Sequence, residues 1–297
     1  MTASSFSARL ADLRRRTRSA LCAGIDPRVD WLPEPLRPSQ GNREETARAF
    51  RDFSIAIVEA AADHCPIFKP QSAFFEALGW RGVRALEEVA AEIRRAGRLV
   101  IGDVKRGDIG TTAEAYADAA FDDTGNGPLF DAVTVNPWMG ADALRPFIAR
   151  AEVTGGGVFV LVKTSNPSAS DLQDLRSDGR PVHAFAADLV RELAGPGADY
   201  SLVGAVVGAT RPAELPGLRA CMPRAWFLLP GVGAQGATMA DTRQAFDADG
   251  LGALVNVSRA LDYAWRGKDG STPSDWRLRI ATAARDLKNE LEGALVP

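Results

Sequence analysis

The chain has 297 residues, of which 46% are hydrophobic and 25% are charged. This composition supports a large hydrophobic core and excludes an intrinsically disordered chain. The net charge of -3 argues against a dedicated nucleic-acid-binding protein, whose binding domain is normally basic, but it is compatible with a local basic pocket for phosphate.

The cysteines and histidines exclude several kinds of site. Cys22, Cys65 and Cys221 are widely separated and include no Cys-x-x-Cys pair, so we expect neither disulfides nor a zinc cluster, and a cytoplasmic location. His64 and His183 are too few for a histidine-rich metal site or a Ser-His-Asp triad, and we expect surface or packing roles for both. We expect no membrane-spanning helix, because the sequence contains no run of 18 apolar residues.

The N-terminal segment is predicted to be a helix. Phe6, Leu10 and Leu13 recur at helical spacing just before the first predicted strand. The arginines and serines around them are typical of a transit peptide, but a removable peptide is rarely joined so closely to a core strand.

Short apolar segments alternate with longer helical patterns along the rest of the chain. The predicted strands cover residues 20–24, 67–70, 99–103, 132–135, 157–162, 202–207, 226–229 and 253–257. The predicted helices lie near residues 43–64, 79–96, 111–121, 141–151, 181–194, 211–220, 238–247 and 274–293. Eight strands, each followed by a helix, predict an α/β fold: one (β/α)8 barrel of the TIM type over residues 1–297. An open doubly wound sheet is the alternative, but it typically has fewer strands.

Polar side chains follow nearly every predicted strand. In barrels of this type the active site lies at the C-terminal ends of the strands. Those ends carry Asp26, Lys69, Asp103, Lys105, Asn136, Thr164, Ser165, Asn166, Gln235, Ser258 and Arg259. Each alone is compatible with a solvated loop, but their joint placement predicts one polar site.

The third predicted strand runs into a row of charges, Asp103, Lys105 and Asp108. Because side chains alternate along a strand, Asp103 and Lys105 are expected to project to the same side. Such a row is costly to desolvate unless its charges pair. An ion pair at the barrel rim would explain one Asp–Lys pair, whereas the whole row at the end of a strand favours a functional site.

A phosphate site is predicted near the end of the chain. Residues 229–236, Leu-Pro-Gly-Val-Gly-Ala-Gln-Gly, form a glycine-rich loop after the seventh strand, and Arg259 follows the eighth. Barrels commonly bind phosphate with these two loops, and the arginine fork suits phosphate oxygens. A flexible loop with a rim arginine is the alternative, but together these features favour a phosphorylated small-molecule substrate.

The segment Asp103-Val-Lys-Arg-Gly-Asp-Ile109 resembles the Asp-x-Lys-x-x-Asp motif of the orotidine 5′-phosphate decarboxylase family. Further segments are similar to that family in order and spacing: Gly24-Ile-Asp-Pro27, Phe68-Lys-Pro-Gln71, Thr164-Ser-Asn-Pro167, Pro230-Gly-Val-Gly-Ala-Gln-Gly236 and Asn256-Val-Ser-Arg259. The similarity extends from the first strand to the eighth and is greatest with the longer bacterial branch. Related barrels share the first motif, but the full set is specific.

The resemblance implies decarboxylation of orotidine 5′-monophosphate to uridine 5′-monophosphate in pyrimidine biosynthesis, without a metal or an organic cofactor. Loss of CO₂ leaves an electron pair in the ring plane at carbon 6, where the π system cannot delocalise it, so a fixed charge must stabilise it. By the resemblance, the Lys105 ammonium would stabilise this carbanion and then protonate it. Asp103 would lie near the departing carboxylate and help to hold Lys105.

The resemblance also implies roles for the other residues. Lys69 and Asp26 would bind the ribose hydroxyls, with Lys69 also part of the charged network. Asp108 and Thr112 would reach into a neighbouring subunit's site, which implies a homodimer.

Three further residues are implied to bind the nucleotide. Ser165 would contact the pyrimidine edge, while Gln235 and Arg259 would hold the phosphate beneath a closing glycine-rich loop. The stretch from Ser168 to Arg180 has no assigned role; a surface excursion and a dimer contact are both open.

Two other functions compete with this interpretation. A metal-dependent phosphosugar aldolase of the hexulose-phosphate synthase type shares the Asp-x-Lys-x-x-Asp framework. Lys69 and the Gly-Val-Gly-Ala-Gln segment favour the decarboxylase instead. A non-catalytic nucleotide-binding barrel would bind its ligand without turnover, and the intact charged row counts against it.

Overall fold

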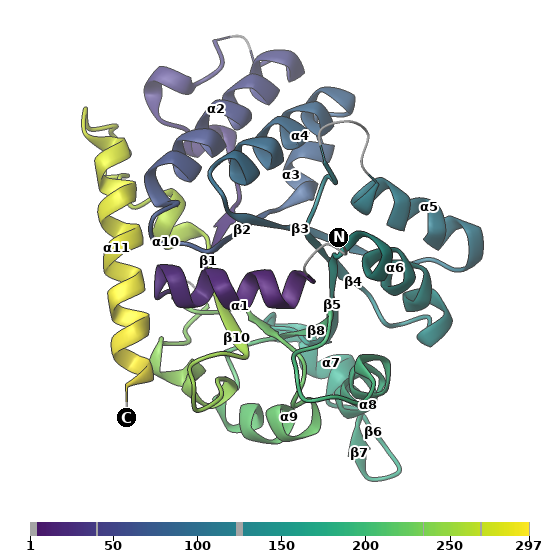
Figure 1. Ribbon diagram of the computed structural model, residues 1–297. Helices are drawn as coiled ribbons and strands as arrows, with labels where there is room; N and C mark the ends of the chain where they lie inside the picture. The colour runs from purple at the N-terminus through teal and green to yellow at the C-terminus, as the bar shows by residue number, and fades with distance from the viewer. Residues whose placement is uncertain (1–4, 40, 123–126, 234, 268, 297) are drawn as a thin grey trace.

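The chain forms a closed barrel of parallel strands in a computed structural model that describes residues 5–39, 41–122, 127–233, 235–267 and 269–296. The barrel strands follow the order β1-β10-β9-β8-β5-β4-β3-β2, with helices around the outside (Figure 1). They are β1 (Leu21–Ile25), β2 (Ile67–Pro70), β3 (Leu99–Arg106), β4 (Ala132–Val135), β5 (Gly157–Lys163), β8 (Val203–Val207), β9 (Phe227–Leu229) and β10 (Ala253–Val257). The predicted (β/α)8 barrel is confirmed.

Helices connect the strands at most of the predicted places. The longer ones are α1 (Phe6–Thr17), α2 (Arg43–Ala61), α4 (Trp80–Arg95), α5 (Gly110–Phe121), α6 (Ala141–Thr154), α8 (Val182–Ala194) and α11 (Trp276–Leu295). Shorter α-helices are α3 (Ser72–Glu76), α7 (Ser170–Gln173), α9 (Leu215–Cys221) and α10 (Arg259–Asp262). The 3₁₀ helices are η1 (Val29–Trp31), η2 (Glu34–Leu36), η3 (Pro167–Ala169), η4 (Pro212–Glu214) and η5 (Ala240–Ala245).

Two predicted helices differ from those observed. The helix expected near 211–220 is divided into η4 and α9, where Pro212 and Pro216 each lack a backbone donor. The helix expected near 238–247 is only the 3₁₀ helix η5. Its buried side chains Thr242 and Ala245, together with Met239 just before it, recur every third residue, which is the spacing that a 3₁₀ helix aligns on one face.

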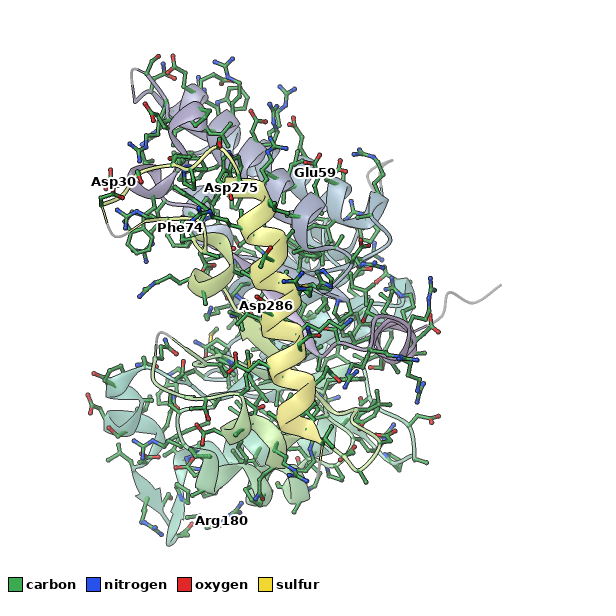
Figure 2. All side chains as sticks on the ribbon, turned by 90° about the vertical axis from the view of Figure 1, so that its left-hand side faces the viewer. Asp30, Glu59, Phe74, Arg180, Asp275 and Asp286 are labelled. Carbon is green, nitrogen blue, oxygen red and sulfur yellow. The ribbon has the colours of Figure 1, made fainter. Side chains whose placement is uncertain are left out.

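The stretch from Ser168 to Arg180 also contains structure that the sequence did not predict. After η3 and α7 it forms a small hairpin of β6 (Arg176–Ser177) and β7 (Arg180–Pro181). Figure 2 shows Arg180 at the far edge of the molecule from Asp30 and Phe74.

The hydrophobic core has two layers because strand side chains alternate. Leu99 and Ile101 of β3 belong to the cluster inside the barrel, whereas Val100 packs into the layer between strands and helices. Helix α1 lies across one end of the barrel (Figure 1). Its Phe6 joins the inner cluster and meets the Phe159 ring edge-on, with ring centroids 5.9 Å apart. Helix α1 therefore closes the end of the barrel opposite the strands' carboxyl ends.

This closure predicts a large loss of stability when Phe6 is truncated. Phe6→Ala should lower the free energy of unfolding by about 3–5 kcal/mol, because it empties a fully packed site. Chemical denaturation measures this loss. Val153→Ala, at a side chain that is 77% exposed, is the control and should stay within about 0.5 kcal/mol of the parent. Equal values for the two variants would contradict a sealing role for α1.

Candidate active site

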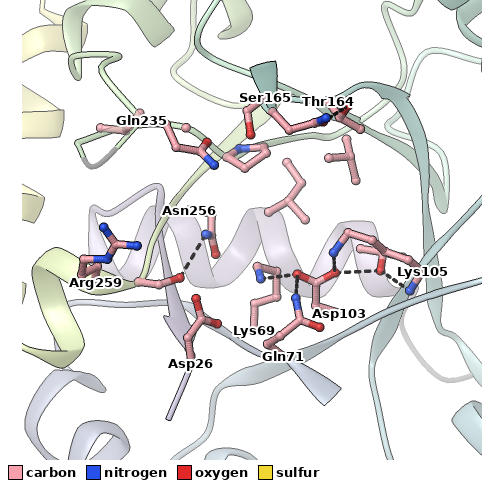
Figure 3. A pocket seen from close by; sticks show the side chains of 18 of the residues that line it. Asp26, Lys69, Gln71, Asp103, Lys105, Thr164, Ser165, Gln235, Asn256 and Arg259 are labelled. Atoms are coloured by element: carbon pink, nitrogen blue, oxygen red, sulfur yellow. Dashed lines mark hydrogen bonds and ion pairs between the residues drawn. The ribbon is translucent and has the colours of Figure 1, made fainter. Parts of the chain in front are cut away.

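A cavity of about 480 Å³ opens at the carboxyl ends of the barrel strands. Seven of the nine residues whose roles the resemblance implies line it: Asp26, Lys69, Asp103, Lys105, Ser165, Gln235 and Arg259. Thr164, Asn166 and Ser258, which were also predicted at these strand ends, line it as well. In Figure 3, Lys105 and Arg259 lie toward opposite ends of the cavity, while Ser165 faces the charged row from the other wall. The cavity therefore has a charged end around Asp103 and a cationic end around Arg259.

The carboxylate of Asp103 is the centre of the charged end. Its Oδ2 lies 2.6 Å from Lys69 Nζ and accepts a hydrogen bond of 3.0 Å from Gln71 Nε2. Its Oδ1 pairs with Lys105 Nζ and accepts a hydrogen bond of 3.1 Å from Thr134 Oγ1 (Figure 3). Four donors thus fix one carboxylate: one side chain each from β2, β3 and β4, and Gln71 directly after β2.

The two lysines keep Asp103 ionised. Burial alone would raise the pKa of Asp103, but the charges of Lys69 and Lys105 hold it well below its usual range. Burial would likewise lower the pKa of Lys69, but Asp103 and Asp26 raise it above its usual value. The buried pair is therefore charged at neutral pH, and each partner compensates the desolvation of the other.

Lys105 reaches Asp103 through an irregular backbone. The predicted end of β3 at Asp103 is wrong, because the strand continues to Arg106 with a register shift between Gly102 and Arg106. Asp103 and Lys105 nevertheless meet on the same side, as predicted. Lys105 has a φ of 45°, which non-glycine residues seldom adopt, and its N–H donates to Thr134 Oγ1 at 3.0 Å. The bulge leaves the Lys105 side chain 46% exposed while Asp103 stays buried, so a ligand can reach the ammonium group.

The cationic end is organised around the Trp31 ring. The guanidinium carbons of Arg28, Arg266 and Arg259 lie 4.8, 5.2 and 5.6 Å from its centroid. Such contacts orient guanidinium groups over an aromatic face. Gly231 on the facing loop has a φ of 109°, a conformation that favours glycine. Within the predicted loop 229–236, residue 234 lies outside the described residues.

Asp26 lies between the two ends, and α10 holds its backbone. Its N–H donates to Asp262 Oδ2 at 3.0 Å, and its carbonyl accepts a hydrogen bond of 2.8 Å from the Tyr263 hydroxyl. Because Arg259 begins the same helix, α10 connects the cationic end to Asp26.

Comparison with known proteins identifies the family to which the chain belongs. The family model for the orotidine 5′-phosphate decarboxylase / HUMPS family matches residues 19–264. The chain belongs to this family. A relative named orotidine 5′-phosphate decarboxylase from Rhodopirellula baltica is 42% identical over 97% of this chain and 99% of its own. Another of that name from Deinococcus radiodurans is 46% identical over 95% of this chain and 94% of its own.

Solved structures agree with the sequence comparisons. A putative orotidine 5′-phosphate decarboxylase from Streptomyces avermitilis matches with a TM-score of 0.81 and 38% identity, covering 99% of this chain and 97% of that chain. A putative orotidine-monophosphate decarboxylase from Toxoplasma gondii also gives 0.81, with 35% identity, covering 98% and 99%. The predicted resemblance to the decarboxylase family is confirmed.

Two predicted site residues lie outside this cavity of the family barrel. Asp108 is half-buried, and its Oδ1 accepts the N–H of Ile109 at 2.8 Å. Thr112 is exposed on α5. Neither residue lines the pocket of its own chain. Asn136 is also outside it, with its Oδ1 accepting the N–H of Trp138 at 3.0 Å.

Several structural contributors to the site were missed from the sequence. Thr134 is a polar residue inside an apolar strand, and Asp262 is an acid within the apolar run Ala-Leu-Asp-Tyr-Ala-Trp at 260–265. Both polar interruptions were available as signals. Trp31 gave no such signal, because its role depends on three arginines that come together only in the fold.

None of the helices in the described part of the chain combines the length and apolarity that crossing a membrane requires. Among the described residues, no three His, Cys, Asp or Glu side chains gather as a metal site would need.

Asp262 predicts a pH-dependent contribution to stability. It is fully buried, and burial together with the charge of Asp26 raises its pKa well above the usual value. Above about pH 4 the unfolded chain releases a proton that folded Asp262 retains, so the wild type loses stability as pH rises toward the folded pKa. Asp262→Asn should therefore gain stability relative to the wild type by up to about 1.4 kcal/mol per pH unit in that window.

Denaturant unfolding at several pH values measures this difference. Asp30→Asn, at an exposed carboxylate, is the control and should show no such slope. A flat difference between Asp262→Asn and wild type would contradict a neutral buried Asp262.

Proposed function

We propose that this protein decarboxylates orotidine 5′-monophosphate to uridine 5′-monophosphate in pyrimidine biosynthesis. The observation that carries the proposal is the buried Lys69–Asp103–Lys105 cluster at one end of a cavity whose other end presents Arg259. Relatives named orotidine 5′-phosphate decarboxylase, at 42% and 46% identity over nearly the full chain, support it. A cytoplasmic location is part of the proposal and accords with the free cysteines.

The nucleotide is proposed to lie across the cavity with its phosphate at Arg259 and Gln235. Its pyrimidine then lies against Ser165, and carbon 6 faces Lys105. Asp26 Oδ1 and Asn256 Oδ1 support this orientation, because both are buried and have no hydrogen-bond partner among the described residues. These oxygens are acceptors for the ribose hydroxyls between the two ends of the cavity.

Lys105 is proposed as the catalytic acid. When the bond between carbon 6 and the carboxylate breaks, its electron pair stays on carbon 6 and CO₂ leaves. The ammonium group, already fixed by Asp103, stabilises this charge without reorganising and then transfers a proton to carbon 6. Asp103 and Lys69 are positioned to keep Lys105 in place.

The phosphate contacts are proposed to assist the reaction from a distance. Binding energy gained at Arg259 and Gln235 holds the ring against the fixed charges at the other end. Closure of the glycine-rich loop over the phosphate would also exclude water from the cavity.

Lys105→Ala tests the mechanism directly. Protein treated with a chelator is mixed with orotidine 5′-monophosphate, and loss of the orotate absorbance is followed. Wild type should convert the substrate without added metal, whereas Lys105→Ala should lose turnover by orders of magnitude and retain its fold and its binding of uridine 5′-monophosphate. The side chain is half-exposed, so its loss opens no core cavity.

Other outcomes would overturn the proposal in different ways. Tight binding of uridine 5′-monophosphate without conversion by wild type would indicate a binding barrel. Conversion of phosphosugars that depends on metal would indicate aldolase chemistry, and undiminished turnover by Lys105→Ala would remove that residue from the mechanism.

We further propose a homodimer in which Asp108 and Thr112 complete the partner's site. Their positions outside the cavity of their own chain support this arrangement. Large apolar side chains are exposed nearby, with Ile109 55% and Trp138 68% exposed. Met139, which is also exposed, approaches Gly107 and so belongs to the same rim.

Mixing inactive variants tests the shared site. Lys105→Ala and Asp108→Asn dimers should each be impaired, but exchanged mixtures should regain activity, because one site of each mixed dimer then has both residues intact. Lys105→Ala mixed with Asp103→Asn is the control and should gain nothing, since both changes affect residues of a site's own chain. Failure of the first mixture to recover, with exchange demonstrated by native mass spectrometry, would contradict the shared site.

A further inference from the structure

The stretch from Ser168 to Arg180 contacts the end of β5 through Gln173 and Asp174, whereas its hairpin is exposed. The stretch follows the site loop, residues 164–166 after β5. The chain then forms η3 and α7 and returns through the β6–β7 hairpin to α8. Figure 1 shows α7 near β8, with the hairpin projecting beyond α8. The part that reaches the site is the end of α7.

Gln173 binds the backbone and the side chain of one residue of the site loop. Its Oε1 accepts the N–H of Thr164 at 3.0 Å, and its Nε2 donates to Thr164 Oγ1 at 2.7 Å. Thr164 Oγ1 in turn donates to Asn166 Oδ1 at 2.7 Å. One amide group therefore fixes the residues on both sides of Ser165.

Asp174 anchors Lys163, the last residue of β5, which precedes Thr164. It pairs with Lys163, whose side chain is only 1% exposed at the end of the strand. Asp174 also lies within 3.4 Å of Arg211 Nη2 and of His183 Nδ1. Two consecutive residues of the stretch thus hold two consecutive residues of β5 and its loop.

Ser165 itself has little freedom on its other sides. A Cβ atom placed on Gly208 would fall 3.0 Å from the Ser165 backbone nitrogen, and one on Gly231 would fall 3.2 Å from Ser165 Cβ. The loop is therefore packed against the neighbouring strand ends as well as against Gln173.

We infer that Gln173 and Asp174 are positioning residues that orient Ser165 toward the pyrimidine, so that this stretch governs recognition of the base. The inference rests on the proposed function, which places the pyrimidine at Ser165. Their contacts end at the Ser165 wall, whereas Arg259 and Trp31 lie on β10 and β1 connections at the other end of the cavity. Loss of Gln173 should therefore weaken ligands that carry a base and leave those with only ribose and phosphate unchanged.

Gln173→Leu separates these two classes of ligand. The change keeps side-chain size and removes both hydrogen bonds to Thr164, so KM for orotidine 5′-monophosphate and the inhibition constant of uridine 5′-monophosphate should rise about tenfold. Inhibition by ribose 5-phosphate should change by less than about twofold. Arg259→Ala changes the phosphate end, which both inhibitors occupy, and should therefore weaken both of them.

Two companion variants make the result specific. Gln173→Glu keeps the acceptor for the Thr164 N–H but loses the donor to Thr164 Oγ1, so it should recover only part of the lost affinity. Asp171→Asn, at an exposed position on the same short helix, should match wild type throughout. Equal weakening of uridine 5′-monophosphate and ribose 5-phosphate by Gln173→Leu, or no weakening of either, would overturn the inference.

Hydrogen exchange at the Thr164 amide gives a readout independent of turnover. Exchange should accelerate in Gln173→Leu and stay unchanged in Asp171→Asn; equal protection in both would refute the positioning contact. A wild type that neither converts orotidine 5′-monophosphate nor binds uridine 5′-monophosphate would refute the proposed function and the base-recognition role with it. An active wild type with an insensitive Gln173→Leu would refute only the inference.

Discussion

The ionised carboxylate of Asp103 is the constraint on which the rest of the site depends. A buried carboxylate is costly unless donors surround it, and here two ammonium groups, an amide and a hydroxyl do so. Removing either lysine would leave an incompletely compensated charge in the barrel. The strand ends around β3 therefore supply the donors that this carboxylate needs. Lys105 is consequently held in position before any ligand binds.

The closed barrel explains how residues from both ends of the chain meet in this site. Because β1 pairs with β10, the segment after β10 lies beside the segment after β1. Asp262 and Tyr263 can then hold both backbone polar groups of Asp26 across more than two hundred residues of sequence. An open sheet would leave β1 and β10 at distant edges, and neither this contact nor the arginine cluster on Trp31 would form.

The sequence predicted the parts of the fold that follow from short-range pattern. Apolar segments located the barrel strands, and ten of the eleven polar residues expected at their ends line the cavity. The prediction was wrong at β3, because a bulge depends on pairing with β4 and not on the composition of β3 itself. It was incomplete at Asp262 and Gln173, whose roles depend on contacts with residues distant in the chain or in a separate loop. The dimer, which would require a second chain, remains a proposal.

The separation of the site into two ends has a physical consequence for catalysis. Asp103 and Lys69 are buried and compensate each other, whereas Lys105 is half-exposed and held by a strained backbone at a φ of 45°. A charge fixed in this way needs no reorganisation when an anion develops beside it. In the proposed mechanism the substrate is held so that carbon 6 meets the ammonium, and the remote cationic end would supply that binding energy. The net charge of the whole chain is uninformative here, because the chemistry depends on where a few cations are placed.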